Sequence, residues 1–122
     1  MLPILTSKQI GIADKFTIKH EPISSINLME RAASCGYKII RGLLKLHQQN
    51  CKIYIFCGVG NNGGDGLAIA RLLRKAGYQT DVILMSNSKK STSDYGINLS
   101  RLEKMGDVRC VSIEEGSVLD LV

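Results

Sequence analysis

Apolar residues follow helical spacing in the first part of this chain. They recur every three or four positions across residues 24–50, which predicts a long amphipathic helix capped by Ser24 or Ser25. A shorter helix is predicted over residues 6–20, because Pro22 interrupts the pattern. The buried face of the long helix is expected to carry Leu28, Ala32, Cys35, Ile39, Leu43 and Leu46.

The pattern then changes to short continuous apolar runs separated by helical segments. Three runs predict strands, at residues 52–58, 79–86 and 107–113, and the first two read as strands buried on both faces. Helices are predicted from about Asp65 to Gly77 and from about Ser91 or Ser93 to Gly106. A fourth strand is expected to begin at 118–122.

This alternation predicts an α/β fold with a mainly parallel sheet, preceded by two helices. Because crossovers between parallel strands are right-handed, the first three strands should lie in the order 3-2-1. The fourth strand should pair with the free side of the first, so that strand order reverses beside the first strand.

Composition narrows the classes of function. The net charge of +5 is modest and the basic residues are scattered, which disfavours DNA or RNA binding but suits a phosphorylated ligand. The four cysteines form no CxxC pair, so we expect reduced thiols, with Cys35 and Cys57 buried. With no signal peptide or membrane-spanning run in view, a cytoplasmic location is expected.

A glycine-rich segment, CGVGNNGGDGLAIARLL, occupies residues 57–73 between the first strand and the next helix. Gly58-x-Gly60-x-x-Gly63 satisfies the dinucleotide fingerprint in that position. Glycines there can adopt positive φ or let backbone approach a ligand, and the N–H groups at a helix start attract phosphate.

The polar residues of this segment leave alternatives open. Asn61 and Asn62 suit either a tight turn or ligand contact, and Asp65 suits either a helix cap or hydrogen bonds from ligand hydroxyls. An ordinary dehydrogenase is disfavoured because no acidic residue follows the second strand, and a Walker loop is excluded because Gly-Lys-Ser/Thr is missing.

The segment GVGNNGGDGLAIARLL closely resembles the signature of the YjeF N-terminal domain family, the NAD(P)H-hydrate epimerases. Two upstream segments, Ala13–Ile18 and Ile23–Ala33, resemble that family's first two helices. The resemblance implies a Rossmann-like three-layer sandwich. It also implies epimerisation of hydrated NADH or NADPH, in which the hydroxyl at C6 of the nicotinamide ring inverts between R and S.

The resemblance also implies roles for individual residues. The family's substrate-binding loop matches Asn61, Asn62, Gly63, Gly64 and Asp65, and Asn62 matches its potassium-contacting asparagine. It further implies an ADP-dependent dehydratase as functional partner or fused domain, and a homodimer. No residue is assigned as the catalytic one, because the family's catalytic carboxylate has no match here.

The family domain is roughly twice as long as this chain. We therefore expect residues 1–122 to form a single domain of this type, truncated on its C-terminal side and without useful epimerase activity when alone. Two alternatives stay open: a non-catalytic nucleotide-binding or scaffold module derived from the same fold, and a generic nucleotide-binding half-domain.

Overall fold

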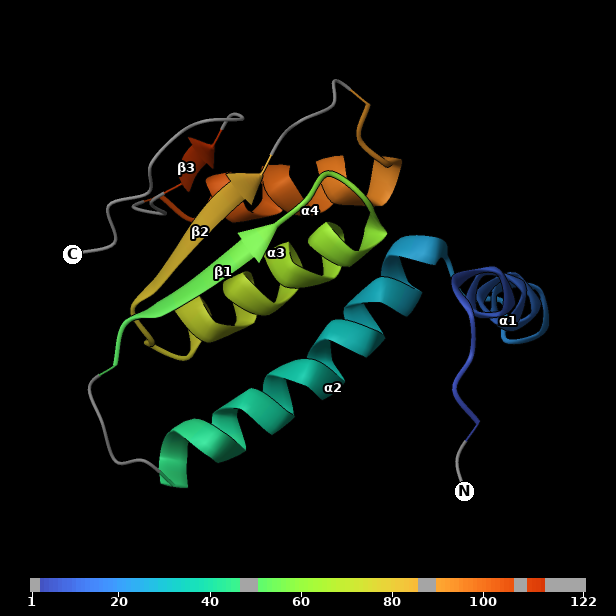
Figure 1. Ribbon diagram of the computed structural model, residues 1–122, viewed down its shortest axis with the longest axis horizontal. Helices are drawn as coiled ribbons and strands as arrows, with labels where there is room; N and C mark the ends of the chain where they lie inside the picture. The colour runs from blue at the N-terminus through green and yellow to red at the C-terminus, as the bar shows by residue number, and fades with distance from the viewer. Residues whose placement is uncertain (1–2, 47–50, 86–89, 107–109, 114–122) are drawn as a thin grey trace.

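A computed structural model describes residues 3–46, 51–85, 90–106 and 110–113. Helices and strands follow one another there in the predicted order (Figure 1). The elements are α1 Ser7–His20, α2 Ser25–Leu46, β1 Ile53–Cys57, α3 Asn61–Lys75, β2 Thr80–Met85, α4 Ser93–Glu103 and β3 Cys110–Ile113. The fourth strand expected at 118–122 lies outside the described residues.

The sheet is parallel, and its strands lie in the order β1-β2-β3, which confirms the predicted order. Ile55 lies opposite Val82, and Val82 in turn lies opposite Cys110. The crossover helices α3 and α4 pack against each other on one face of this sheet. These features confirm an α/β, Rossmann-like fold.

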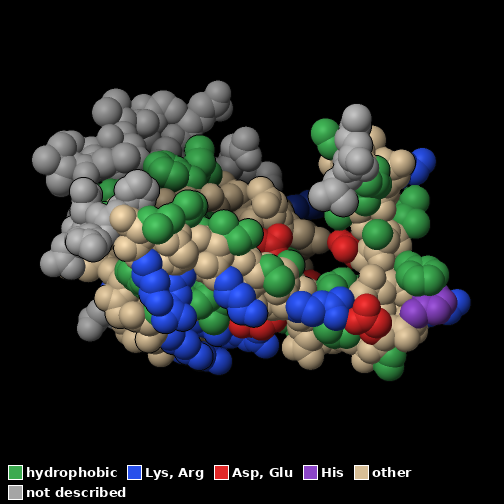
Figure 2. All heavy atoms as spheres, turned by 90° about the horizontal axis from the view of Figure 1, so that it is seen from below, with side chains coloured by type: hydrophobic (Ala, Val, Ile, Leu, Met, Phe, Trp, Pro, Cys, Tyr) green, Lys and Arg blue, Asp and Glu red, His purple; other side chains and the backbone are tan. Residues whose placement is uncertain are grey.

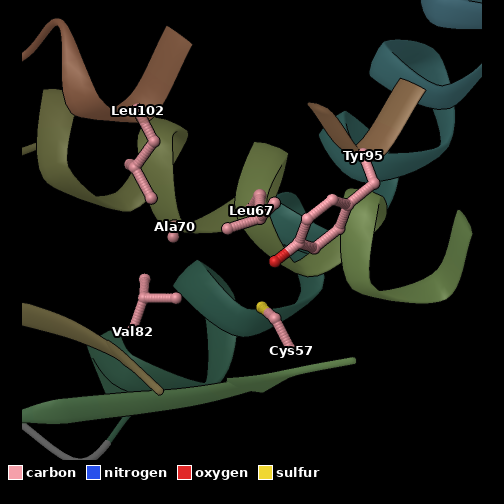
Figure 3. Packing of buried hydrophobic residues seen from close by; sticks show 6 residues of the cluster. All are labelled: Cys57, Leu67, Ala70, Val82, Tyr95 and Leu102. Atoms are coloured by element: carbon pink, nitrogen blue, oxygen red, sulfur yellow. The ribbon is translucent and has the colours of Figure 1, made fainter. Parts of the chain in front are cut away.

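The core forms between the sheet and these two helices. Cys57 of β1 and Val82 of β2 point toward side chains of α3 and α4 (Figure 3). The cluster consists of Cys57, Leu67, Ala70, Val82, Tyr95 and Leu102. Burial of Cys57 is confirmed.

The prediction that β1 is buried on both faces is wrong for its outer face. Phe56 is 51% exposed, because the described helices that contact the sheet cover the opposite face. The described residues therefore supply one helical layer and the sheet of the expected sandwich.

The predicted buried face of α2 is also wrong. Ile39 is 68% exposed and Cys35 is exposed, whereas Met29 and Ala33 are buried. The side of α2 that packs on α3 lies about one residue further round the helix, since successive residues are about 100° apart. An apolar flank, Ile39, Leu43 and Leu46, stays exposed in the described structure.

Helix ends follow local chemistry. Thr6 and Gln9 form a reciprocal capping box at the start of α1. Gly77 and Gly106, which follow α3 and α4, have φ of 86° and 66°. These positive values explain why glycine ends both helices.

Gly63, Gly64 and Gly66 serve close packing rather than positive φ. Among the described glycines, positive φ is confined to Gly77 and Gly106. A Cβ added at Gly63 would lie 1.6 Å from the carbonyl oxygen of Gly58, and one at Gly64 would lie 2.8 Å from Met29 Sδ. The interpretation of the glycines at 58–66 as positive-φ positions is therefore wrong. Close packing inside the protein explains Gly63 and Gly64, whereas Gly58 and Gly60 have open space around them.

An ion-pair network joins the three neighbouring helices. Arg71 of α3 donates to both carboxylate oxygens of Glu30 on α2, and Arg101 of α4 lies 3.6 Å from the same carboxylate. The Arg71 side chain is only 11% exposed, so it depends on Glu30 for charge compensation.

Replacing Gly63 with Ala should destabilise the protein by more than about 3 kcal/mol, because the new methyl group collides with the backbone carbonyl of Gly58, which cannot rotate aside as a flexible side chain can. Gly58→Ala is the matched control, since its Cβ would meet nothing within 4 Å. Urea unfolding followed by circular dichroism measures both. Equal stabilities for the two variants would contradict the packing argument.

Glu30→Gln should lower the free energy of unfolding by about 2 kcal/mol, less than for a fully buried pair because Glu30 remains 30% exposed. Glu21→Gln removes the carboxylate of the exposed Glu21–Arg31 pair and should leave the unfolding midpoint almost unchanged. Thermal unfolding measures the midpoints of both variants. Equal midpoints for Glu30→Gln and Glu21→Gln would show that the ion-pair network does not stabilise the fold.

Candidate functional site

Helix α3 begins earlier than the sequence suggested. It starts at Asn61, not at Asp65, so the asparagines and glycines belong to its first turn. Gly60 is the N-cap, with extended backbone and no side-chain cap. Both the turn interpretation of Asn61 and Asn62 and the capping role of Asp65 are therefore wrong.

This helix start lies at the carboxyl end of β1, where ligands bind in open α/β sheets. The first intrahelical bond runs from the Gly64 amide to the Gly60 carbonyl, at 3.0 Å. Amides earlier in the helix have no acceptor within it, so they can bind an anion. The amide of Thr92 donates to the carbonyl of Val59 at 3.2 Å, which holds the segment before α4 beside this turn.

The five predicted site residues divide into two kinds. Asn61 and Asn62 are exposed and Asp65 is half-buried, so their side chains can reach a ligand. Gly63 and Gly64 are buried, and they shape the turn without facing solvent. The structure thus brings the five together in one helical turn, but only three of them offer a functional group.

A pocket of about 200 Å³ lies next to this turn, between α1 and the starts of the other three helices. In Figure 2, acidic side chains lie on both sides of the hollow between α1 and the rest of the molecule. The lining residues are Ile10, Asp14, Ile18, Ser25, Leu28, Met29, Ala32, Asn61, Asp65 and Asp94.

Three aspartates give the pocket its electrostatic character. Burial raises the pKa of Asp65, and the nearby charge of Asp14 raises it further. Asp94 accepts a hydrogen bond of 2.5 Å from the hydroxyl of Ser25. Among the described residues, no three acidic, histidine or cysteine side chains are grouped closely enough to hold a metal ion.

The arrangement therefore combines two chemistries. The start of α3 offers amide groups and the positive end of a helix dipole, which suit phosphate. The pocket offers carboxylates, which repel phosphate and accept hydrogen bonds from hydroxyl groups.

Of the three aspartates that line the pocket, the sequence predicted Asp65 as a site residue but not Asp14 or Asp94. The sequence signal for Asp14 is its place in the segment Ala13–Ile18, which resembles the first helix of the family. The signal for Asp94 is its place in the first turn of α4, two residues after the N-cap Thr92.

Comparison with known proteins places these features in one family. A family model described as "YjeF-related protein N-terminus" matches residues 25–120. The chain is 33% identical over 107 residues to an NAD(P)H-hydrate epimerase of Weissella koreensis, covering 87% of this chain and 47% of the relative. It is 40% identical over 92 residues to an NAD(P)H-hydrate epimerase of Limosilactobacillus fermentum, covering 75% of this chain and 42% of the relative.

A longer relative and a solved structure extend the comparison. A bifunctional NAD(P)H-hydrate repair enzyme of Moorella thermoacetica is 36% identical over 106 residues, covering 84% of this chain and 19% of that enzyme. The crystal structure of a yeast protein superposes with a TM-score of 0.75 and 27% identity, covering 95% of this chain and 49% of the yeast chain. The chain thus spans about half the length of the epimerases it matches.

Asp65→Asn should increase the free energy of unfolding near pH 7. Because its pKa in the folded protein is raised above the ordinary 3.8, the folded state holds the proton more strongly than the unfolded state. Its ionisation therefore weakens the fold as pH rises from about 3.8 through the raised value. The gain from the amide should shrink as the pH falls toward 3.8.

Urea unfolding between pH 4 and pH 7 measures this difference, with Glu103→Gln as a control that removes an exposed carboxylate on α4. If Asp65→Asn were less stable than the parent protein at pH 7, the carboxylate would be stabilising the fold and the argument from burial would be wrong.

Proposed function

The chain belongs to the family of YjeF-related protein N-termini, and we propose that it binds hydrated NADH or NADPH as part of an NAD(P)H-hydrate epimerase. The reaction inverts the hydroxyl at C6 of the hydrated nicotinamide ring between R and S. One observation carries the proposal: the turn Asn61–Asp65 starts a helix at the carboxyl end of β1 and adjoins a pocket. The relatives named as epimerases support the choice of substrate.

In this proposal the described residues bind and orient the substrate. Backbone amides at the start of α3 bind the pyrophosphate, and Asn61 and Asn62 contact the ligand beside it. Asp65 accepts a hydrogen bond from a ligand hydroxyl. Inversion also needs a group that moves a proton near the ring, and that catalytic residue stays unassigned.

Asn62 is proposed to supply one oxygen ligand to a potassium ion. Its side chain is exposed at the helix start, and an amide oxygen is a hard neutral donor of the kind that a monovalent cation accepts. One amide oxygen cannot hold the ion alone, so Asn62 would act as one ligand among several. The bound ion would supply positive charge beside the pyrophosphate.

The partner proposed for this activity is an ADP-dependent NAD(P)H-hydrate dehydratase, which would consume the epimerised product. Relatives named as bifunctional repair enzymes are about five times longer than the matched segment, which supports a second activity on the same chain in those proteins. A homodimer and a cytoplasmic location are proposed with it. Among the described helices, none is both long enough and apolar enough to cross a membrane.

We expect ADP-ribose to perturb the backbone amide resonances of residues 58–65 in an NMR titration of the 122-residue chain. Asn62→Ala should weaken binding about tenfold, through loss of one hydrogen bond near charged groups, and should remove any difference between potassium and sodium buffers. Asn27→Ala is the matched control, because Asn27 is an exposed asparagine in the first turn of α2.

A second variant tests the approach of backbone to ligand. Gly60→Val places a branched side chain where nothing lies within 4 Å, so it should block the ligand while the fold stays intact. Titration without any change in residues 58–65 would refute the binding site. Conversion of the R to the S hydrate, measured with an S-specific dehydratase, separates an epimerase from a module that binds the nucleotide without turnover.

A further inference from the structure

Helix α1 presents one stripe of side chains to the pocket. Ile10, Asp14 and Ile18 are spaced four residues apart, so they lie on one side of the helix, and all three line the pocket. No residue of α1 is buried. This helix precedes the segment matched by the family model, which begins at residue 25. Helix α1 therefore forms one side of the pocket.

Asp14 faces two residues of the predicted binding turn across this pocket. Asn61 and Asp65 line it from α3, so the pocket is continuous with the helix start proposed to bind phosphate. The charge of Asp14 is felt at Asp65, where it adds to the effect of burial on the pKa. Asp94 differs from both, because it already accepts a hydrogen bond from Ser25.

The lining of the pocket defines the chemistry of a suitable ligand. Ile10, Ile18, Leu28, Met29 and Ala32 supply apolar contacts for a carbon skeleton. Carboxylates on facing walls disfavour an anion and favour a group that donates hydrogen bonds. A sugar ring meets these requirements, since it has hydroxyl donors around a compact apolar frame.

We propose that Asp14 is a further ligand-binding residue of the site, and that Asp14 and Asp65 together accept hydrogen bonds from the hydroxyl groups of a ribose. The phosphate next to that ribose lies at the start of α3, beside Asn61. This assignment rests on the proposed function, because it requires a dinucleotide at the helix start. It makes α1 one wall of the binding site.

The test compares two probes on the complete chain. ADP-ribose carries both phosphate and ribose, whereas inorganic pyrophosphate carries only the former. Asp14→Asn should weaken ADP-ribose binding about tenfold and leave pyrophosphate binding unchanged or slightly stronger, because a charge-assisted hydrogen bond is lost while repulsion of anions falls. Glu103→Gln, which removes an exposed carboxylate from α4 outside the pocket lining, should change neither affinity.

Resonances of Ile10, Ile18 and Ala32 report on the pocket, and those of residues 58–62 report on the helix start. ADP-ribose should perturb both sets in the parent chain. Perturbation of the helix start alone, or equal weakening of both probes by Asp14→Asn, would overturn the role of Asp14 while leaving the proposed function intact. Failure of ADP-ribose to bind the parent chain would overturn both. Because Asp14 is exposed and its charge repels that of Asp65, the unfolding midpoint of Asp14→Asn should be equal to or slightly above that of the parent, which checks the fold.

Discussion

The close approach of α3 to its neighbours is the constraint on which the site depends. Gly63 lies against the backbone of Gly58, Gly64 against Met29, and Gly66 against Cys57, whose Sγ would be 2.8 Å from an added Cβ. A side chain at any of these positions would push the helix start away from β1 or α2. The absence of Cβ atoms at these three glycines thus fixes where the exposed Asn61 and Asn62 lie. This placement comes from packing within the protein and needs no ligand.

A second consequence of this packing is that three helix starts meet at one pocket. Ser25 begins α2, Asn61 begins α3, and Asp94 lies in the first turn of α4, and all three line the cavity. The positive ends of three helix dipoles partly offset the aspartates gathered there. Asp65 still has a raised pKa, so burial and the charge of Asp14 outweigh that compensation at its position. The pocket is consequently acidic, although the helix start beside it suits anions.

Sequence reasoning succeeded where a local signal decides the structure. The start of α1 next to Thr6, the glycines that end α3 and α4, and the order of the strands all follow from short-range chemistry or from the handedness of crossovers. Sequence reasoning failed where contacts between residues far apart in the chain decide which side chains are buried or meet. The apolar arc of α2 is wide enough to include both Ala33 and Ile39, and periodicity cannot say which side meets α3. Likewise, nothing local places Asp14 opposite Asp65.

In the proposed function, binding and catalysis are separable, and the described residues are assigned to binding. In the proposed function, affinity for phosphate comes from the backbone amides at the start of α3, whose positions are set by the close packing of Gly63 and Gly64. Proton transfer needs one group placed within hydrogen-bonding distance of the reacting ring, so it depends on a single side chain. A protein can therefore lose turnover by one substitution while the turn Asn61–Asp65 keeps its shape. For this reason the turn Asn61–Asp65 supports the proposed binding of a phosphate-bearing ligand more directly than it supports the proposed reaction.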